Sequence, residues 1–351
     1  MTFLSDPPRY DASRTYAWNY DHAPDPIPCP VPVVPGEWSF CSLPAASPLG
    51  IAAGPLLNGR WCLYYAGLGF DVLTYKTVRS GRRDCYSPPN LQPVDCEVLT
   101  GSPAFVHATG DMRGSWAVSF GMPSAAPDTW RRDIEWTRNH LAADKILSVS
   151  VVGTVQDGWT MDDLANDYAL CARWALESGA DCIETNFSCP NVTTCDGQLY
   201  QHARHSRLVA QTVRAAIGKT PYIIKIGHAV IDEAIESLLD AVGDVADALA
   251  MTNSIASMVM RDEELMFDGQ QRGICGAAIR DESIRQVKRF ANVIEAKQLS
   301  TQLIGVGGIE TAADVQCYLD AGAHACQLAT APMLEPMVGL KIRQQMAHAV
   351  A

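Results

Sequence analysis

The stretch that decides the fold reads Asp181-Cys182-Ile183-Glu184-Thr185-Asn186-Phe187-Ser188-Cys189-Pro190-Asn191. It begins as an apolar β-type run, and the proline after Cys189 excludes a continuing helix, so the thiol is expected on a loop where a strand ends. In a parallel α/β barrel, catalytic residues gather at that edge. The segment therefore predicts a strand followed by a substrate pocket that holds one thiol and the amides of Asn186 and Asn191.

Similar strand-type runs recur along the chain from about Pro48, and they alternate with amphipathic stretches such as 161–178 and 312–321. This alternation is typical of a parallel sheet flanked by helices, and eight repeats favour a closed barrel. The eight runs are Leu49 to Ala53, Val72 to Lys76, Leu147 to Val152, Cys182 to Asn186, Tyr222 to Ile226, Ala248 to Thr252, Leu303 to Val306 and Ala325 to Leu328. We therefore predict an α/β fold, a (β/α)8 TIM barrel over residues 48–351.

Two regions depart from this repeat. Residues 1–47 are rich in proline and are expected to form an irregular arm on the surface, to which we assign no chemistry. Residues 78–145 are an insertion after the second strand and contain a β-like run from Ser115 to Phe120. Because insertions at this end of a barrel usually cover the active site, 78–145 is expected to be a β-containing roof.

Composition limits the functional classes. Apolar residues make up 48% and charged residues 19% of the 351 residues, so a large core can form. The formal net charge of −12, without a long basic run, argues against a nucleic-acid partner. Short apolar runs and a start without a signal-peptide pattern predict a cytoplasmic protein without a membrane partner. The 12 cysteines include no Cys-x-x-Cys pair, so we expect reduced thiols and no metal site.

A glycine-rich turn suggests a phosphate site. Gly305-Val306-Gly307-Gly308-Ile309 follows the seventh strand, and Ala329-Thr330 ends the eighth. Glycines let backbone N–H groups approach an anion, and barrel phosphate sites commonly form after strands seven and eight. A tight β-to-α turn without a ligand is the alternative for the glycines alone.

Lysines and asparagines at strand ends predict a binding site for a planar, electron-rich ring. Lys76 and Lys225 end two apolar strands, where a buried ammonium needs an anion or several acceptors. The alternative for each lysine is that its methylene chain is buried while its ammonium reaches water. Asn186, Asn191 and Asn253 offer amide donors and acceptors that suit an imide or a carboxylate. A turn-forming role is credible for Asn191, which follows a proline.

In this order, the motifs strongly resemble the class 1 dihydroorotate dehydrogenases, which are FMN-dependent (β/α)8 barrels, and a related domain of dihydropyrimidine dehydrogenase. The resemblance covers roughly Pro48 to Met333. The matching pieces are Ala52-Ala53-Gly54-Pro55, Thr74 to Thr77, Asn186 to Asn191, Lys225, Thr252-Asn253-Ser254, Gly273-Ile274-Cys275-Gly276, Gly305 to Glu310 and Ala329-Thr330.

The resemblance implies a role for each matching residue. Cys189 would be the base that removes a proton from the substrate while hydride leaves for flavin N5, and Lys76 would lie between flavin and substrate as the second catalytic residue. Because a free thiol has a pKa of about 8.5, neighbouring donors must favour the thiolate. Lys225 would lie near flavin N1 and O2. The implied substrate ligands are Asn186, Asn191, Asn253, Ser254 and Ser119. The implied FMN ligands are Ala53, Gly54, Lys76, Thr77, Lys225, Gly276, Gly307, Gly308, Ala329 and Thr330.

One departure puts the substrate in question. Where the family usually has Asn-Ser-x-Gly-x-Pro, this chain has Val118-Ser119-Phe120-Gly121-Met122-Pro123. Losing a hydrogen bond to a charged ligand group costs roughly 1.5–3 kcal/mol. The expected reaction is oxidation of dihydroorotate to orotate, with a neutral dihydropyrimidine or another cyclic substrate as the alternative.

Two further hypotheses are a flavin-binding subunit without catalysis and an RNA-modifying dihydrouridine synthase. The excess of acidic over basic residues argues against the second. Electrons would pass to fumarate within a homodimer, or to an electron-transfer flavoprotein partner that serves NAD.

Overall fold

Eight parallel strands form a closed barrel in the computed structural model, which describes residues 7–101, 105–188 and 198–348. Around the barrel they are β3 (Leu49–Ile51), β4 (Val72–Val78), β8 (Ile146–Val151), β9 (Cys182–Asn186), β10 (Tyr222–Lys225), β11 (Ala248–Met251), β15 (Gln302–Val306) and β16 (Ala325–Leu328), and β16 pairs with β3 to close the ring. These are the eight runs that the sequence predicted, with ends that differ by at most two residues. The predicted TIM barrel is confirmed.

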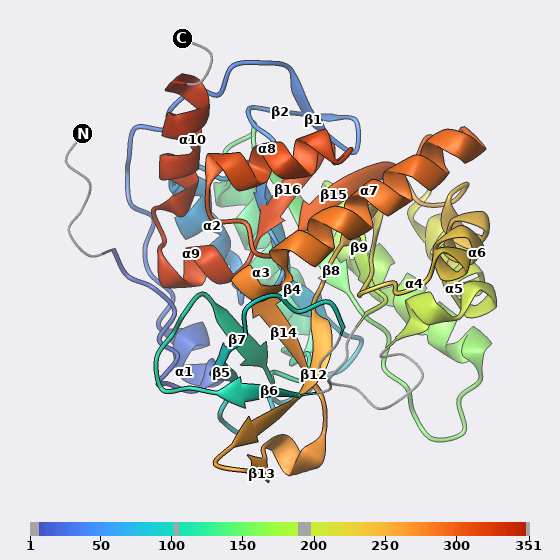
Figure 1. Cartoon of the computed structure of the whole chain (residues 1–351). Helices are drawn as coiled ribbons and strands as arrows, with labels where there is room; N and C mark the ends of the chain where they lie inside the picture. The colour runs from blue at the N-terminus through green and yellow to red at the C-terminus, as the bar shows by residue number, and fades with distance from the viewer. Residues whose placement is uncertain (1–6, 102–104, 189–197, 349–351) are drawn as a thin grey trace.

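Helices surround the barrel on its outside (Figure 1). They are α2 (Gly59–Gly67), α3 (Pro127–His140), α4 (Met161–Glu177), α5 (Ala203–Ile217), α6 (Asp232–Val242), α7 (Arg280–Lys297), α8 (Ala312–Asp320), α9 (Thr330–Leu334) and α10 (Val338–His348). Capping boxes start two of them, with Thr160 and Asp163 on α4 and Thr311 and Asp314 on α8. Each box satisfies orphan N–H groups at the point where the chain leaves the barrel edge.

The end of the barrel opposite the roof is closed by a hairpin of the proline-rich arm. The arm, predicted to be irregular, contains a short helix, α1 (Tyr16–Asp21), and a hairpin, β1 (Trp38–Phe40) and β2 (Leu43–Ala45). Phe40 and Cys41 pack with inward-facing apolar residues at the base of the strands, among them Cys182. In Figure 1 the hairpin lies at the far end of the barrel from the roof.

A buried charge network ties the last helix to the barrel. Asp71 is fully buried at the start of β4 and bonds to Arg343 of α10, to Lys145 at 2.5 Å and to Ser47. Arg343 also donates from Nε to the carbonyl of Gly69 at 2.6 Å. Because Asp71 and Arg343 are almost fully buried, removing Arg343 would leave the buried carboxylate with less compensation for its desolvation.

The roof over the other end is a six-stranded sheet, and only half of it comes from the insertion that the sequence analysis identified. The excursion after β4 contributes β5 (Leu91–Asp95), β6 (Phe105–Ala108) and β7 (Ser115–Val118). The excursion after β11 contributes β12 (Ile255–Arg261), β13 (Glu264–Leu265) and β14 (Arg272–Gly276). Pairing of β14 with β7 joins the halves, and an apolar core that includes Val94, Val106 and Ile274 lies within the sheet. The rest of the predicted 78–145 roof is α3, which packs against α2 in the outer ring.

A polar contact fixes the loop after β10. His228 Nε2 lies 2.8 Å from Glu282 Oε1 near the start of α7, and Arg285 Nε donates to Glu282 Oε2 at 2.9 Å. Burial raises the pKa of Glu282, but hydrogen bonds from His228 and Arg285 outweigh burial and hold that pKa below its usual value.

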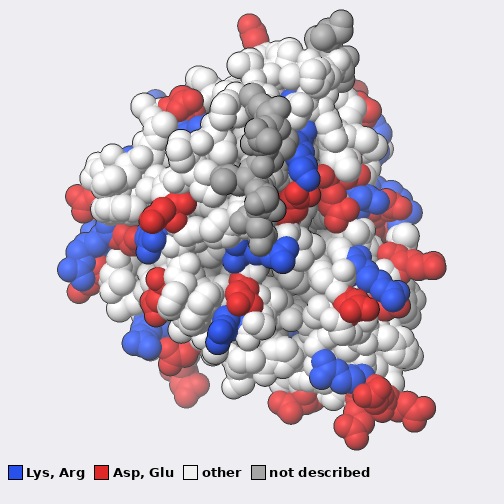
Figure 2. Space-filling model, turned by 90° about the vertical axis from the view of Figure 1, so that its left-hand side faces the viewer, with Lys and Arg blue, Asp and Glu red and all other residues white. Residues whose placement is uncertain are grey.

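Charge on the surface is mixed. On the face drawn in Figure 2, lysine and arginine side chains are interspersed with acidic ones. Exposed ion pairs of the protein include Arg82 with Asp84 and Arg113 with Asp95. Within the described parts of the chain, no helix combines the length and hydrophobicity needed to cross a bilayer.

Candidate active site

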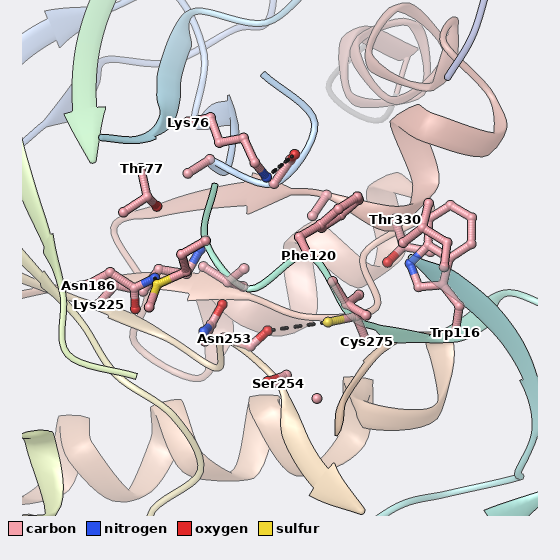
Figure 3. Close-up of a pocket in the computed structure, with 18 of the residues that line it drawn as sticks. Lys76, Thr77, Trp116, Phe120, Asn186, Lys225, Asn253, Ser254, Cys275 and Thr330 are labelled. Carbon is pink, nitrogen blue, oxygen red and sulfur yellow. Dashed lines mark hydrogen bonds between the residues drawn. The ribbon is translucent and has the colours of Figure 1, made fainter. Parts of the chain in front are cut away.

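A cavity lies where the carboxyl ends of the barrel strands meet the roof (Figure 3). Its lining combines strand-end polar residues with apolar residues from the roof. The lining residues are Ala53, Gly54, Lys76, Thr77, Leu91, Trp116, Val118, Phe120, Gly121, Met122, Asn186, Lys225, Asn253, Ser254, Gly273, Cys275, Val306, Ala329, Thr330 and Met333.

Lys76 enters the cavity from the end of β4 and is held by aromatic rings. Its Nζ donates to the carbonyl of Gly54 at 3.1 Å and lies 4.5 Å from the ring centre of Phe120 and 5.6 Å from that of Tyr16. Only 7% of the residue is exposed. These cation–π contacts help to compensate the desolvation of the ammonium.

Lys225 and Asn186 lie side by side at the ends of β10 and β9, where the register pairs them directly. Lys225 is 4% exposed and lines the cavity. The Asn186 side chain accepts from the Ser188 backbone N–H at 3.0 Å, and its amide nitrogen lies 3.6 Å from Met122 Sδ. The strand register thus fixes a cation and an amide as neighbours at the cavity wall.

Asn253 and Ser254 approach from the end of β11. The Asn253 amide donates to the carbonyl of Ser188, the residue before the predicted base. Ser254 lines the cavity and is 7% exposed. Cys189 and Asn191 lie outside the described residues.

The segment that departs from the family pattern forms one wall. Val118 lines the cavity at the end of β7, where it pairs with Leu91 and Gly273. Ser119 lies behind this wall, because its hydroxyl accepts from Arg272 Nε at 2.8 Å and its backbone bonds to Asn90. The predicted contact of Ser119 with substrate stays a prediction, although β-type alternation turns neighbouring side chains to opposite faces.

A narrower lobe continues from the main cavity, and it includes the predicted phosphate glycines Gly276, Gly307 and Gly308. All three have positive φ, of 99°, 127° and 65°. An added Cβ on Gly308 would lie 2.6 Å from the Arg280 side chain and 2.8 Å from the Gly276 carbonyl. Only glycine fits this turn without strain. Ala329 and Thr330 line both lobes.

The two lobes fit the FMN that the sequence implies. The main lobe has apolar and aromatic walls with amides and two ammonium groups, which suits a planar ring system. The space beside Gly54 is open, since an added Cβ would meet only Ala329, at 4.0 Å. In the narrow lobe, Thr252 Oγ1 and Gln327 Oε1 are buried and have no hydrogen-bond partner among the described residues, so a polar ligand would satisfy them. Glu310 also lines this lobe and is offset by Arg280, 3.9 Å away.

Several lining residues were missed by sequence reasoning. Phe120 and Met122 belong to the Val118–Pro123 segment, so the departure from the family pattern was a usable signal. Tyr16 reaches Lys76 from the arm to which the sequence analysis assigned no chemistry. Cys275 adds a second thiol, whose Sγ lies 3.6 Å from the Asn253 carbonyl. Burial raises its pKa to about 12 despite the opposing effect of Lys225, so it is a neutral thiol at physiological pH.

The chain matches the family model of dihydroorotate dehydrogenase over residues 112–350. Among curated proteins it is 29% identical to a dihydroorotate dehydrogenase of Dictyostelium discoideum, with 86% of each chain covered. It is 31% identical to the catalytic subunit of a dihydroorotate dehydrogenase B (NAD(+)) of Desulforudis audaxviator, over 85% of this chain and 87% of that protein. A quinone-type relative from Arthrobacter is 28% identical over 86% of this chain and 82% of its own.

The fold is also similar to that of solved structures. The dihydroorotate dehydrogenase of Eimeria tenella in complex with ferulenol superposes with a TM-score of 0.74 over 95% of this chain and 89% of that one, at 18% identity. The ligand-free form of that protein gives a TM-score of 0.72.

Proposed function

Because the chain belongs to the dihydroorotate dehydrogenase family, we propose that it is an FMN-dependent oxidoreductase that converts dihydroorotate to orotate. One observation carries the proposal. Two buried ammonium groups, Lys76 and Lys225, face a single cavity together with the amides of Asn186 and Asn253. This combination suits a flat, electron-rich cofactor stacked with a pyrimidine that has imide and carboxylate groups.

Bound FMN would supply the hydride acceptor at N5. The positive charge of Lys225 would stabilise negative charge that develops on the ring, and Lys76 would hold its ammonium toward ring and substrate through its contacts with Gly54 and Phe120. Ala53, Gly54 and Thr77 would border the ring. Gly276, Gly307, Gly308, Ala329 and Thr330 would surround the phosphate.

Cys189 would act as the base. Its thiolate would take a proton from the substrate carbon next to a ring carbonyl, while hydride leaves the adjacent carbon. The amides of Asn186, Asn191 and Asn253, with Ser254, would orient the pyrimidine so that both C–H bonds face their acceptors. A cysteine base is the reason to assign the chain to class 1. Fumarate in a homodimer, or an electron-transfer flavoprotein partner, would then receive the electrons.

Val118 supports a second candidate substrate. A hydrocarbon lines the cavity where the family pattern has an amide, so a neutral ring such as dihydrouracil would lose less than dihydroorotate. The two substrates differ by a carboxylate, which is the group that an amide or a cation at this wall would recognise.

Anaerobic mixing of the yellow holoprotein with each substrate tests these proposals. We expect dihydroorotate to bleach the flavin absorbance and dihydrouracil to do so more slowly. A reversed order would select the second candidate, and a flavin that neither substrate bleaches would favour a subunit without catalysis.

The base is tested separately by Cys189→Ser, with exposed Cys317→Ser as the matched control. Loss of a general base slows flavin reduction by roughly 10²- to 10⁴-fold, whereas the control should reduce at the parent rate. Equal rates for both variants would exclude Cys189.

A further inference from the structure

The interior of the barrel contains a polar layer beneath the cavity. Its members point inward from the middle of the strands: Thr74 on β4, Ser148 and Ser150 on β8, Glu184 on β9 and Gln327 on β16, and each is fully buried. Gln327 Nε2 donates to Thr74 Oγ1 at 2.9 Å, and Gln327 also lines the narrow lobe of the active site. The layer is therefore continuous with the cofactor site.

Several polar atoms of this layer lack hydrogen-bond partners among the described residues. Ser148 Oγ, both carboxyl oxygens of Glu184, and Gln327 Oε1 are buried and unpartnered, and so is Thr252 Oγ1 at the narrow lobe. Clusters of buried polar atoms of this kind commonly hold ordered water, because each water bonds to two to four such groups. Water at this level would join Glu184 to the cofactor lobe.

Glu184 is exceptional in this interior. It is the only aspartate or glutamate in the eight barrel strands, all of whose residues the structure describes. It lies on the inward face of β9, two residues before Asn186, whose register partner on β10 is Lys225. Lys225 is thus the cation nearest in register, and its charge favours the ionised form of Glu184.

The other groups that face Glu184 do not carry charge at physiological pH. Ser150 is its register partner on β8 and favours the carboxylate, although no hydrogen bond of ordinary geometry joins the two. Cys182, on the same strand, and Cys41, in the hairpin that closes the barrel base, are thiols whose pKa burial raises, to about 12 for Cys182. Burial also raises the pKa of Glu184 itself, against the effect of Lys225. Two opposing effects therefore act on the pKa of Glu184, since desolvation raises it and the Lys225 ammonium lowers it.

We propose that Glu184 is the alternating counter-charge of Lys225, a positioning residue that is a carboxylate while the bound cofactor is oxidised and a carboxylic acid once the cofactor ring is negatively charged. This inference rests on the proposed function, because it takes the ring beside Lys225 to be FMN. When the ring is neutral, the Lys225 ammonium is balanced by the carboxylate. When two electrons from the substrate make the ring an anion, Lys225 is balanced by the ring, and the unbalanced carboxylate takes up one proton.

The proton count closes over one turnover. The substrate loses a hydride to the cofactor and a proton to the base. Glu184 gains a separate proton from solvent through the water of the polar layer, and returns it when an acceptor reoxidises the cofactor. No net proton is consumed at Glu184, and no bond other than O–H forms or breaks there.

Redox titration of the holoprotein with dithionite tests the proposal without reference to the substrate. In infrared difference spectra, reduction of the parent should produce a protonated-carboxyl band that shifts in D₂O. Glu184→Gln should lack this band, whereas Ser148→Ala, a neutral change in the same layer, should keep it. Absence of the band in the parent would overturn the proposal even if the variants do not fold.

The midpoint potential gives a second readout. Glu184→Gln removes the carboxylate that opposes negative charge on the ring. The equilibrium ratio of reduced to oxidised FMN should therefore rise about tenfold, which corresponds to a midpoint potential about 30 mV higher. The gap from the parent should widen as pH rises, since the parent carboxyl is then ionised in both redox states. Equal potentials at every pH would overturn the proposal.

The outcomes separate this inference from the function on which it rests. A protein that dihydroorotate reduces normally, but without the carboxyl band, would refute only the role of Glu184. A protein that dithionite reduces with the band, but that dihydroorotate does not reduce, would refute only the substrate. Purified protein that binds no FMN would refute both.

Discussion

Replacing Val118 by asparagine should restore an amide at a cavity wall where the chain departs from the family pattern. Val118 lies at the end of β7 between Leu91 and Gly273, and its side chain faces the cavity. Asparagine is close to valine in size, so the strand pairing need not change, and water in the cavity can satisfy the new amide. A hydrogen bond to a charged ligand group contributes about 1.5–3 kcal/mol. Orotate should therefore bind Val118→Asn about 10- to 150-fold more tightly than it binds the parent.

The assay is a titration of the oxidised holoprotein with orotate, followed by the flavin absorbance. Uracil is the matched control ligand, because it has the same ring without the carboxylate and its affinity should change less than threefold if the new amide bonds to that group. Val118→Leu is the matched control variant, since it adds no donor. Unchanged orotate affinity in Val118→Asn, with an unchanged melting temperature, would refute the conclusion that this wall faces the substrate.

Three further predictions address the cofactor lobe and the scaffold. Gly308→Ala should weaken FMN binding at least about tenfold in a fluorescence titration, because the new Cβ meets backbone and side-chain atoms at a position with positive φ. The control Gly81→Ala, where nothing lies within 4 Å of the new Cβ, should bind FMN as the parent does. Arg343→Met should lower the free energy of unfolding in urea by about 3–5 kcal/mol, because it removes one cation from buried Asp71 and leaves Lys145 as the cation that still pairs with this carboxylate. A loss below about 1 kcal/mol would contradict this. Glu282 has a folded-state pKa below its unfolded value, so its contribution to stability is complete above the unfolded pKa and is lost as pH falls through the folded one. Melting temperatures of Glu282→Gln and the parent should accordingly differ at pH 7 and converge in acid; a constant difference would contradict the linkage.

The barrel could be predicted from the sequence because its strands are short apolar runs in a regular alternation. Strand ends such as Lys76, Asn186 and Lys225 were informative for the same reason. A charged or amide side chain at the end of an apolar strand is expected to face the cavity at the carboxyl edge of the barrel. The structure brings these three residues to one cavity.

The roof and the arm were harder to predict. The strands β12 and β14 pair with segments that lie more than a hundred residues away, as in the pairing of Gly273 with Val118, and such pairing leaves no local pattern. Ser119 was taken as a substrate ligand from its place in a motif, but the side chain of Arg272 binds its hydroxyl behind the wall. The position of Tyr16 against Lys76 depends on how the arm folds back over the barrel, which its proline-rich composition does not specify.

A structure of the protein with FMN and orotate would test the central claim most directly. The account predicts the ring in the main lobe in contact with both Lys76 and Lys225, the phosphate against Gly307 and Gly308, and orotate over the ring between the amides of Asn186 and Asn253. A ring system bound anywhere else, or either ammonium turned away from it, would contradict the account.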